Sequence, residues 1–266
     1  MVVTLMLFAS FVEMRRWVHH AQLELVPAIV PATLDAAAIA HPPAQELASR
    51  MRRDIADVLT PPRRERLAVL TFDDGPYPVT TPALLATLRR LAVSADFFLI
   101  GDDAREQPDI AFRLAQAGME LGNHTLTHPE MSTLSFPAQL EEIVDGAVTI
   151  RRVTGRVTTY FRPPHGNFDE ATLQAAKAAG ETVALWNVDA GDWRTVTPAD
   201  VVTRVVAQAR SPAVILLHNG KEPTIQALAD IVSAYRRAGF TFVTLSELQR
   251  RLPIDAINDP VRITLR

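Results

Sequence analysis

The residues of this chain that could do chemistry gather in five short polar segments, each of which follows an apolar, strand-like run. The segments are Thr71–Pro76, Asn123–His128, Phe161–Gly166, Asp189–Trp193 and Leu216–His218. Their functional side chains are His124, His128, His165, His218 and the adjacent Asp73 and Asp74. Imidazoles and carboxylates can together hold a divalent ion and transfer protons. The set therefore predicts one metal-hydrolase site.

Two of these segments carry metal-ligand chemistry. His124 and His128 are spaced i, i+4, so both imidazoles can face one ion on a helix or in a tight turn. Taken alone, such a pair is more often a surface coincidence. Asp73 and Asp74 end an apolar run, and Gly75–Pro76 predicts a sharp turn after them. Because successive strand side chains point to opposite sides, we expect one acid to bind metal and its neighbour to act as a base. The competing interpretation is an ordinary turn or N-cap pair.

The other segments offer an arginine and a histidine with partners. Arg162 precedes two prolines, which would fix the direction of its guanidinium for pairing with a carboxylate, although a surface arginine on a proline-rich loop fits equally. His218 follows the apolar run Val214–Leu217 and is either a core histidine or a functional one. Asp192 offers a carboxylate to orient it, and Trp193 an apolar wall.

The segments sit in a rhythm of short apolar runs and amphipathic helical stretches that begins after Arg66. We expect strands at Leu67–Phe72, Ala95–Ile100, Met119–Gly122, Thr158–Phe161, Thr182–Asn187, Ala213–Leu217 and Thr241–Thr244. We expect helices centred on Pro82–Leu91, Ile110–Ala117, Pro137–Val153, Glu170–Ala179, Pro198–Ala207 and Thr224–Ala238. Helix caps are expected at Thr81, Thr197, Gly180 and Gly239. Alternating strands and helices favour a parallel sheet, and polar segments at the ends of at least five strands favour a barrel-like ring.

Composition limits the class of protein. A chain of 266 residues with 48% hydrophobic content suits one α/β domain. The net charge of -3, without a long basic run, argues against nucleic acid as a partner. The absence of cysteine excludes disulfides and thiolate ligands, so a metal would be held by His, Asp, Glu or backbone oxygen.

The first 64 residues do not share this rhythm. Met1–Val12 is apolar but shorter than a membrane span, and it is either the remnant of a signal or anchor segment or an amphipathic helix. Leu25–Pro43 is typical of a linker, and Leu47–Leu59 has helical spacing. We expect an N-terminal extension at 1–64, a catalytic domain at 65–252 and a tail at 253–266. An exported or envelope-associated protein, with membrane association through the N-terminus, is favoured; oligomeric state is not indicated.

In order and spacing, the five segments resemble the five motifs of the polysaccharide deacetylases, the NodB-homology domain of carbohydrate esterase family 4, over Ala68–Leu252. The resemblance implies an α/β fold, a distorted (β/α) barrel of about seven strands. It also implies a metal site, usually zinc, made of Asp74, His124 and His128. The implied activity is removal of N-acetyl groups from a chitin- or peptidoglycan-like glycan, with release of acetate.

The resemblance also implies roles for single residues. Asp73 would be the general base paired with Arg162, and His218 the general acid oriented by Asp192. Leu216 and Trp193 would form the walls of the acetyl pocket. His165 stands where the motif often has tyrosine, with its backbone N–H near the oxyanion; the roles of its side chain and of Asp189 are left open.

Two rival functions remain. The same fold can remove O-acetyl groups or open a non-sugar amide, and the aromatic residues Tyr77, Phe168 and Trp193 only hint at a surface for stacking sugars. A catalytically silent glycan-binding module is less expected, because the base, the acid and the three ligands are all present.

Overall fold

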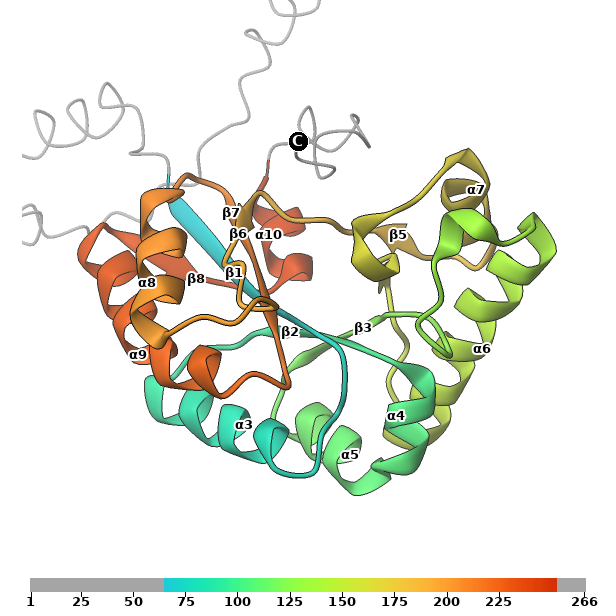
Figure 1. Cartoon of the computed structure of the whole chain (residues 1–266), viewed down its shortest axis with the longest axis horizontal. Coiled ribbons are helices and arrows are strands. Elements are labelled where there is room, and N and C mark those ends of the chain that lie inside the picture. Colours follow the sequence, from blue (N-terminus) through green and yellow to red (C-terminus); the bar gives the residue numbers. More distant parts are fainter. Residues whose placement is uncertain (1–64, 253–266) are drawn as a thin grey trace, which may run out of the picture. The chain divides into compact units, whose positions relative to one another are not determined.

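The structure is a computed structural model of the chain and describes residues 65–252 (Figure 1). The N-terminal segments discussed above and the tail 253–266 lie outside the described residues. The description below concerns the described residues of the unit Pro62–Arg266. None of its described helices is both long and apolar enough to cross a bilayer.

Parallel strands form one curled sheet in the described part of the chain. They are β1 (Arg66–Asp73), β2 (Asp96–Leu99), β3 (Glu120–Asn123), β4 (Tyr160–Phe161), β5 (Thr182–Val183), β6 (Val188–Asp189), β7 (Ala213–His218) and β8 (Phe240–Phe242). Their order is β5-β4-β3-β2-β1-β7-β6, with β8 paired to the start of β1. The two ends of this path, β5 and β6, are consecutive in the chain but not hydrogen-bonded to each other. The sheet is therefore a distorted, incompletely closed barrel.

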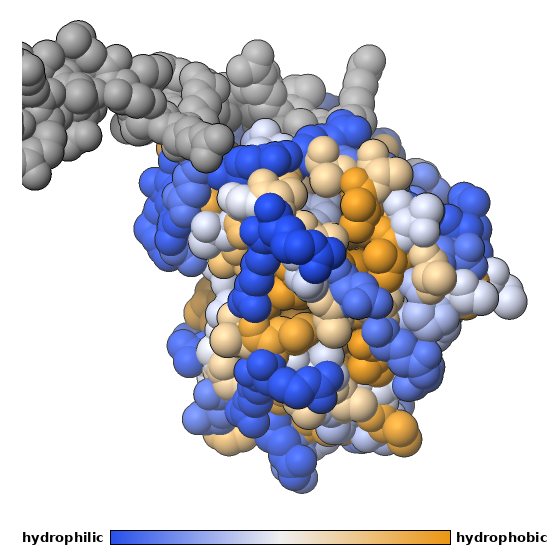
Figure 2. Space-filling view, turned by 90° about the vertical axis from the view of Figure 1, so that its left-hand side faces the viewer, coloured by the Kyte–Doolittle hydropathy of each residue, from blue (hydrophilic) through white to orange (hydrophobic). Residues whose placement is uncertain are grey.

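Helices lie around the outside of the sheet, except α10 (Leu245–Arg251), whose Leu245 and Leu248 pack against Leu67 and Val69 on its inner side (Figure 1). They are α3 (Thr80–Leu91), α4 (Gly101–Glu106), α5 (Pro108–Gln116), α6 (Phe136–Thr154), α7 (Glu170–Ala178), α8 (Pro198–Ala207), α9 (Glu222–Arg237) and α10, with 3-10 turns η1 (Met131–Thr133) and η2 (Pro164–Gly166). On the side at the left of Figure 1, polar side chains are interspersed with smaller apolar areas (Figure 2). A surface of this kind is ordinary for the outer helices of a globular domain.

The central strand β1 is buried on both faces, as expected of a strand inside a parallel sheet covered by helices. Alternation along β1 divides its side chains into two sets. Ala68, Leu70 and Phe72 join the main core under the helices, whereas Leu67 and Val69 join a smaller core. The row that contains Leu67 and Val69 continues through Thr71 to Asp73, since strand side chains repeat every second residue.

Strand β7 repeats this arrangement beside β1. Ile215 and Leu217 pack in the main core and Val214 in the smaller one. The row of Val214 continues through Leu216 to His218, and His218 is the register partner of Asp73. Two neighbouring strands thus bring an acid and a histidine to the same level, at their carboxyl ends, where α/β barrels carry their chemistry.

Several predicted elements need correction. The run Thr182–Asn187 is not one strand, because β5 ends at Val183 and a separate β6 begins at Val188. The cap predicted at Thr81 is wrong: α3 begins at Thr80, and the Thr81 hydroxyl instead donates to Asn219 Oδ1 at 2.8 Å. The short helices α4 and α10 were not predicted.

The other cap predictions are confirmed. Thr197 accepts a hydrogen bond from the Asp200 backbone in a capping box at the start of α8. Gly180 and Gly239 follow the ends of α7 and α9 with φ of 79° and 80°, a left-handed conformation that glycine adopts without strain.

Candidate active site

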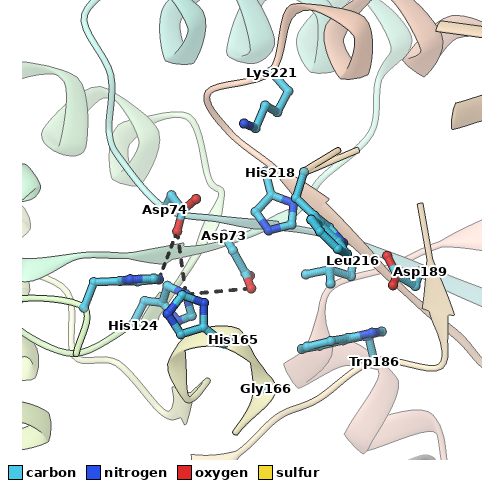
Figure 3. Close-up of a pocket in the computed structure, with 12 residues that line it drawn as sticks. Asp73, Asp74, His124, His165, Gly166, Trp186, Asp189, Leu216, His218 and Lys221 are labelled. Atoms are coloured by element: carbon cyan, nitrogen blue, oxygen red, sulfur yellow. Dashed lines mark ion pairs between the residues drawn. The ribbon is translucent and has the colours of Figure 1, made fainter. Parts of the chain in front are cut away.

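All five polar segments reach one pocket of about 480 Å³ at the carboxyl ends of the strands. It is lined by Asp73, Asp74, His124, His128, His165, Gly166, Trp186, Asp189, Trp193, Leu216, His218 and Lys221. Figure 3 shows Asp73, Asp74 and His124 grouped on one side, with Leu216 and Trp186 facing them across the pocket. Arg162 and Asp192, which were predicted as catalytic residues, do not line the pocket but lie behind it and hold residues that do.

Three ligand atoms converge at the pocket wall. Asp74 Oδ1 lies 3.4 Å from His128 Nε2 and 3.7 Å from His124 Nε2, and the three atoms lie within 4.8 Å of one another. These separations are long for hydrogen bonds. They are close to the distance of about 3.4 Å that separates two ligands around one tetrahedral ion with bonds of about 2.0–2.2 Å. One carboxylate and two imidazoles are also donors that suit zinc.

The protonation of His124 fits a metal ligand. Its Nδ1 lies 2.7 Å from the carbonyl oxygen of Arg162, so Nδ1 carries the proton and donates it, which leaves the lone pair of Nε2 toward Asp74. Burial is the main cause that lowers the pKa of His124, to about 3, against the opposing charge of Asp74. The imidazole is therefore neutral at physiological pH, the form that binds metal.

The ligand-bearing loop after β3 is a tight turn rather than a helix. Thr125 and His128 have φ of 71° and 63°, a left-handed region that non-glycine residues rarely occupy. Hydrogen bonds hold the turn: the Thr125 N–H donates to Asn123 Oδ1 at 3.0 Å, and the His128 N–H donates to Thr125 Oγ1 at 2.9 Å. The left-handed backbone explains how two histidines four residues apart face one point without a helix.

Behind this turn lies a buried amide and a buried acid. Asn123 Nδ2 donates to Glu181 Oε2 at 2.7 Å and to the Ile143 carbonyl at 2.8 Å, and the Thr158 hydroxyl donates to the other Glu181 oxygen. Burial raises the pKa of Glu181 to about 7. Sequence reasoning missed this pair because an Asn and a Glu 58 residues apart give no local signal.

Asp73 and Asp74 have different partners, Arg162 for Asp73 and the two histidines for Asp74, and simple strand alternation does not explain this. Asp73 ends β1 on the row facing the barrel interior, whereas Asp74 has φ of 73° and leaves the strand. The left-handed residue turns the second carboxylate toward the same pocket instead of away from it. His124 Nε2 accordingly lies within 3.9 Å of Asp73 Oδ2 as well as near Asp74.

Arg162 is fully buried and pairs with Asp73, so the surface-arginine alternative is wrong. Its Nη1 donates to Asp73 Oδ1 at 2.6 Å and to Thr71 Oγ1 at 2.8 Å. Its Nε and Nη2 donate to the carbonyls of Ala184 and Leu185. Burial raises the pKa of the Asp73 carboxyl, and the charge and hydrogen bond of Arg162 oppose that rise. The guanidinium thus favours the ionised base.

His218 is held by Asp192 on the other side of the pocket. Its Nδ1 lies 2.7 Å from Asp192 Oδ1, and its backbone N–H donates to Asp192 Oδ2 at 2.8 Å. Burial acts to lower the pKa of His218, but the hydrogen bond and charge of Asp192, with smaller effects of Asp73 and Asp74, outweigh it and raise the pKa. His218 is therefore neither a core histidine nor a metal ligand in the cluster above.

The pocket walls combine expected and unexpected residues. Leu216 and Trp193 line it as expected, and Trp193 is 52% exposed. His165 lines it with φ of 60°, and its ring packs edge-on against that of His128, with centroids 4.9 Å apart. Asp189 also lines it, and its Oδ1 accepts from the Gly191 N–H at 2.7 Å. Of the aromatic residues expected to stack sugars, only Trp193 lines this pocket; Phe168 does not, and Tyr77 lines a second cavity instead.

Two lining residues were not predicted. Trp186 lies two residues after Ala184, which packs inside the barrel. Alternation along the expected strand could therefore have predicted that Trp186 also faces the interior. Lys221 follows His218 by three residues, at the start of α9. As an isolated lysine in a loop it had no pattern that would single it out.

Comparisons with known proteins show which family this sequence resembles. Residues 60–184 match the family described as polysaccharide deacetylase. A peptidoglycan-N-acetylglucosamine deacetylase of Bacillus cereus is 36% identical over 194 residues, which cover 71% of this chain and 91% of that protein. Peptidoglycan-N-acetylmuramic acid deacetylase PdaC of Bacillus subtilis is 33% identical over 185 residues, 70% of this chain and 39% of that protein.

The fold agrees as well. The solved structure of peptidoglycan deacetylase PdaC from Bacillus subtilis superimposes with a TM-score of 0.67 at 31% identity, covering 74% of this chain and 96% of that one. Sequence identity above 30% over most of a relative's length, together with the shared distorted barrel, establishes that this chain belongs to the polysaccharide deacetylase family.

Proposed function

We propose that this protein is a metal-dependent deacetylase that hydrolyses the acetamide of N-acetylated amino sugars in a cell-wall-type glycan. One observation carries the proposal. A buried acid paired with arginine, Asp73, and a histidine paired with acid, His218, lie at the same level on neighbouring strands, beside the ligand cluster of Asp74, His124 and His128. A base, an acid and a place for an ion are what amide hydrolysis requires.

The chain's own residues would divide the reaction as follows. Asp74, His124 and His128 would hold the ion, for which we propose zinc. When bound, such an ion lowers the pKa of water and polarises a carbonyl group. Asp73 would take a proton from the attacking water, and Arg162 would favour the ionised form of that carboxylate and fix its direction. The backbone N–H near His165 would stabilise the oxyanion, and Leu216 and Trp193 would enclose the acetyl methyl.

Cleavage needs a proton for the departing nitrogen, because an amine anion is a very poor leaving group. His218 is placed to supply it. Asp192 fixes its Nδ1–H, so its Nε2 is the nitrogen that remains for the substrate, and the raised pKa keeps the imidazolium populated toward neutral pH. The C–N bond breaks as the proton reaches nitrogen, which yields acetate and a free amine on the sugar.

The relatives named above are named for peptidoglycan, which supports a cell-wall glycan as substrate and an exported or envelope location for this protein. We propose 65–252 as the catalytic domain, because every residue of the candidate site falls inside it. Removal of O-acetyl groups, hydrolysis of a non-sugar amide and silent glycan binding are the alternatives to be separated.

A panel of acetylated substrates tests the proposal. Chitin oligomers, peptidoglycan and acetylxylan are incubated with the full chain, with and without a chelator and with zinc restored, and released acetate is measured. We expect zinc-dependent release from the N-acetylated glycans. Release from acetylxylan alone would identify an O-deacetylase, and glycan binding without any acetate release would identify a silent module; either result overturns the proposal.

A further inference from the structure

Lys221 lies at the junction of two cavities. It lines the catalytic pocket together with Asp74 and His218, and it also lines a second cavity of about 350 Å³. The second cavity is bounded mainly by the loop after β1, residues 74 and 77–80, and by Gly220 and Lys221. Asp74 and Lys221 are the residues shared by the two. In Figure 3 the Lys221 side chain extends beside His218, on the side away from Trp186. A group bound at Lys221 would therefore lie next to the reacting sugar.

The ammonium of Lys221 has no acidic partner in the described part of the chain. The side chain is half-buried, and no carboxylate of residues 65–252 forms an ion pair with it. The acid next to it in sequence, Glu222, accepts instead from Gln226 Nε2 at 3.1 Å. Asp192 is occupied by His218 and by the Thr224 hydroxyl.

Lys221 is also unusual within the chain. Of 27 Lys and Arg residues, only 177 and 221 are lysines. Lys177 is exposed on α7, whereas Lys221 is, among residues 65–252, the sole lysine or arginine that lines the catalytic pocket. Two arginines lie near the pocket without lining it: Arg162 is paired with Asp73, and Arg194 stacks on the ring of Trp193. Lys221 is thus the positive side chain of the pocket wall that pairs with no described acid.

A neutral sugar hydroxyl can accept a hydrogen bond from an ammonium group but does not neutralise its charge. A carboxylate is the partner that satisfies both its charge and its donors. We propose that Lys221 recognises a carboxylate carried by the substrate, so that the enzyme prefers an acidic glycan to a neutral homopolymer. This inference rests on the proposed deacetylase function and names the substrate class of the same site.

Three substrates separate charge from size. They are a chitin tetrasaccharide, a tetrasaccharide in which N-acetylglucosamine alternates with N-acetylmuramic acid, and the methyl ester of the second. The ester has the shape of the acidic substrate without its charge. The value of kcat/KM for acetate release is measured for each, at low and at high salt. We expect the wild-type enzyme to prefer the acid over its ester, and the preference to shrink at high salt because screening weakens a partly exposed pair.

Variants assign the preference to one side chain. Lys221→Gln should lower the acid-to-ester ratio of kcat/KM about ten-fold, the usual scale for a charge-assisted hydrogen bond at a partly solvated site. Lys221→Arg should keep most of the ratio, because it keeps the charge. Lys177→Gln is the matched control and should leave the ratio unchanged. The salt dependence of the wild-type acid-to-ester ratio tests recognition of the carboxylate charge without relying on the folding of a variant.

The results separate this inference from the proposed function. No acetate from any of the substrates would overturn the proposed function and this inference with it. Release from all three with an acid-to-ester ratio near one would overturn this inference alone, as would a Lys221→Gln variant that slows the acid and its ester equally.

Discussion

Asp192 accepts two hydrogen bonds from His218, one from the ring Nδ1–H and the other from the backbone N–H. The oxygen that accepts from the backbone N–H also accepts from the Thr224 hydroxyl, 2.5 Å away. The ring can neither rotate nor exchange tautomers without breaking a buried, charge-assisted bond. The same carboxylate raises the pKa of His218 against the effect of burial. Orientation and acidity of the imidazole thus depend on one residue.

His218→Ala should lose hydrolysis of acetamides far more than hydrolysis of aryl acetates. An amide nitrogen needs a proton in order to leave, whereas an aryl oxide leaves without one. Loss of a general acid costs about 10² to 10⁴ in rate. The kcat/KM values for an N-acetylated glycan and for an aryl acetate, measured with metal content matched, give the comparison. Equal losses on both substrates would assign His218 to binding or to oxyanion stabilisation instead.

Asp192→Asn should show a milder form of the same bias and a shifted pH profile. A general acid must be protonated, so activity falls as the pH rises through its pKa. Without the carboxylate that raises it, the pKa of His218 drops, and the alkaline limb of the kcat/KM profile for the acetamide moves to lower pH. The pH profile of the aryl acetate serves as the control, since it does not require the acid. An unmoved alkaline limb would contradict the role given to Asp192.

Asp73→Asn and Asp74→Asn should separate metal binding from proton transfer. Asp74 belongs to the ligand cluster, while Asp73 is held by Arg162. We expect Asp73→Asn to retain about one metal ion per chain and to lose about 10² to 10⁴ in turnover. Asp74→Asn, like His128→Ala, should lose metal. Metal content after dialysis and acetate release decide between them, and equal metal loss in the two aspartate variants would contradict the division.

The residues that sequence predicted best are those tied to strand ends. Asp73 and His218 terminate long apolar runs, and a strand of fixed rise and period-two alternation leaves little freedom in where its last side chain points. The strand ends also led to the prediction of a barrel, because a ring of strands brings the polar residues at their ends together. The pairing of Arg162 with Asp73 came from the family resemblance, because the two prolines after Arg162 restrict its backbone but fit a surface arginine equally.

The parts that sequence did not predict depend on contacts between distant segments or on left-handed residues. Asp74 turns into the pocket only because its φ is positive. A positive φ is uncommon outside glycine, and no local sequence pattern predicted it here. Ala184 to Trp186 interrupts the expected strand, since the carbonyls of Ala184 and Leu185 bind the Arg162 side chain rather than a neighbouring strand. Such tertiary demands override local strand preference.

Gly146→Ala should weaken metal binding without touching a ligand. Gly146 lies inside α6, where a Cβ atom would stand 2.5 Å from Asn123 Oδ1 and 2.8 Å from the carbonyl carbon of Thr125. Alanine would favour the helix by about 1 kcal/mol. Overpacking costs about 1–3 kcal/mol, and here the neighbour is the backbone of the ligand-bearing turn. We expect the cost of overpacking to exceed the gain in helix propensity, so Gly146→Ala should be less stable and bind zinc more weakly in titrations.

Val148→Ala is the control for that experiment, because Val148 lies two residues away on the same helix and is 45% exposed. It should leave zinc affinity unchanged. A Gly146→Ala protein that is more stable than the wild type and binds zinc equally well would show that the turn tolerates the added methyl and that α6 does not position the ligands.

Glu181→Gln should make the protein more resistant to unfolding at alkaline pH. The pKa of Glu181 is about 7 in the folded protein and near 4.5 without burial, so the folded state holds the proton more tightly than the unfolded state. Stability from this group is complete below about pH 4.5, falls as the pH rises from there to about 7, and is constant above that.

Glutamine keeps an acceptor for Asn123 and cannot ionise. The wild type should therefore lose roughly 3 kcal/mol of unfolding free energy, relative to Glu181→Gln, as the pH rises from 4.5 to 8. Urea titrations across this range measure it, with the exposed Glu141→Gln as control. A difference between variant and wild type that does not change with pH would mean that Glu181 is ionised throughout, and that Asn123 and the ligand-bearing turn rest on a buried carboxylate rather than a carboxylic acid.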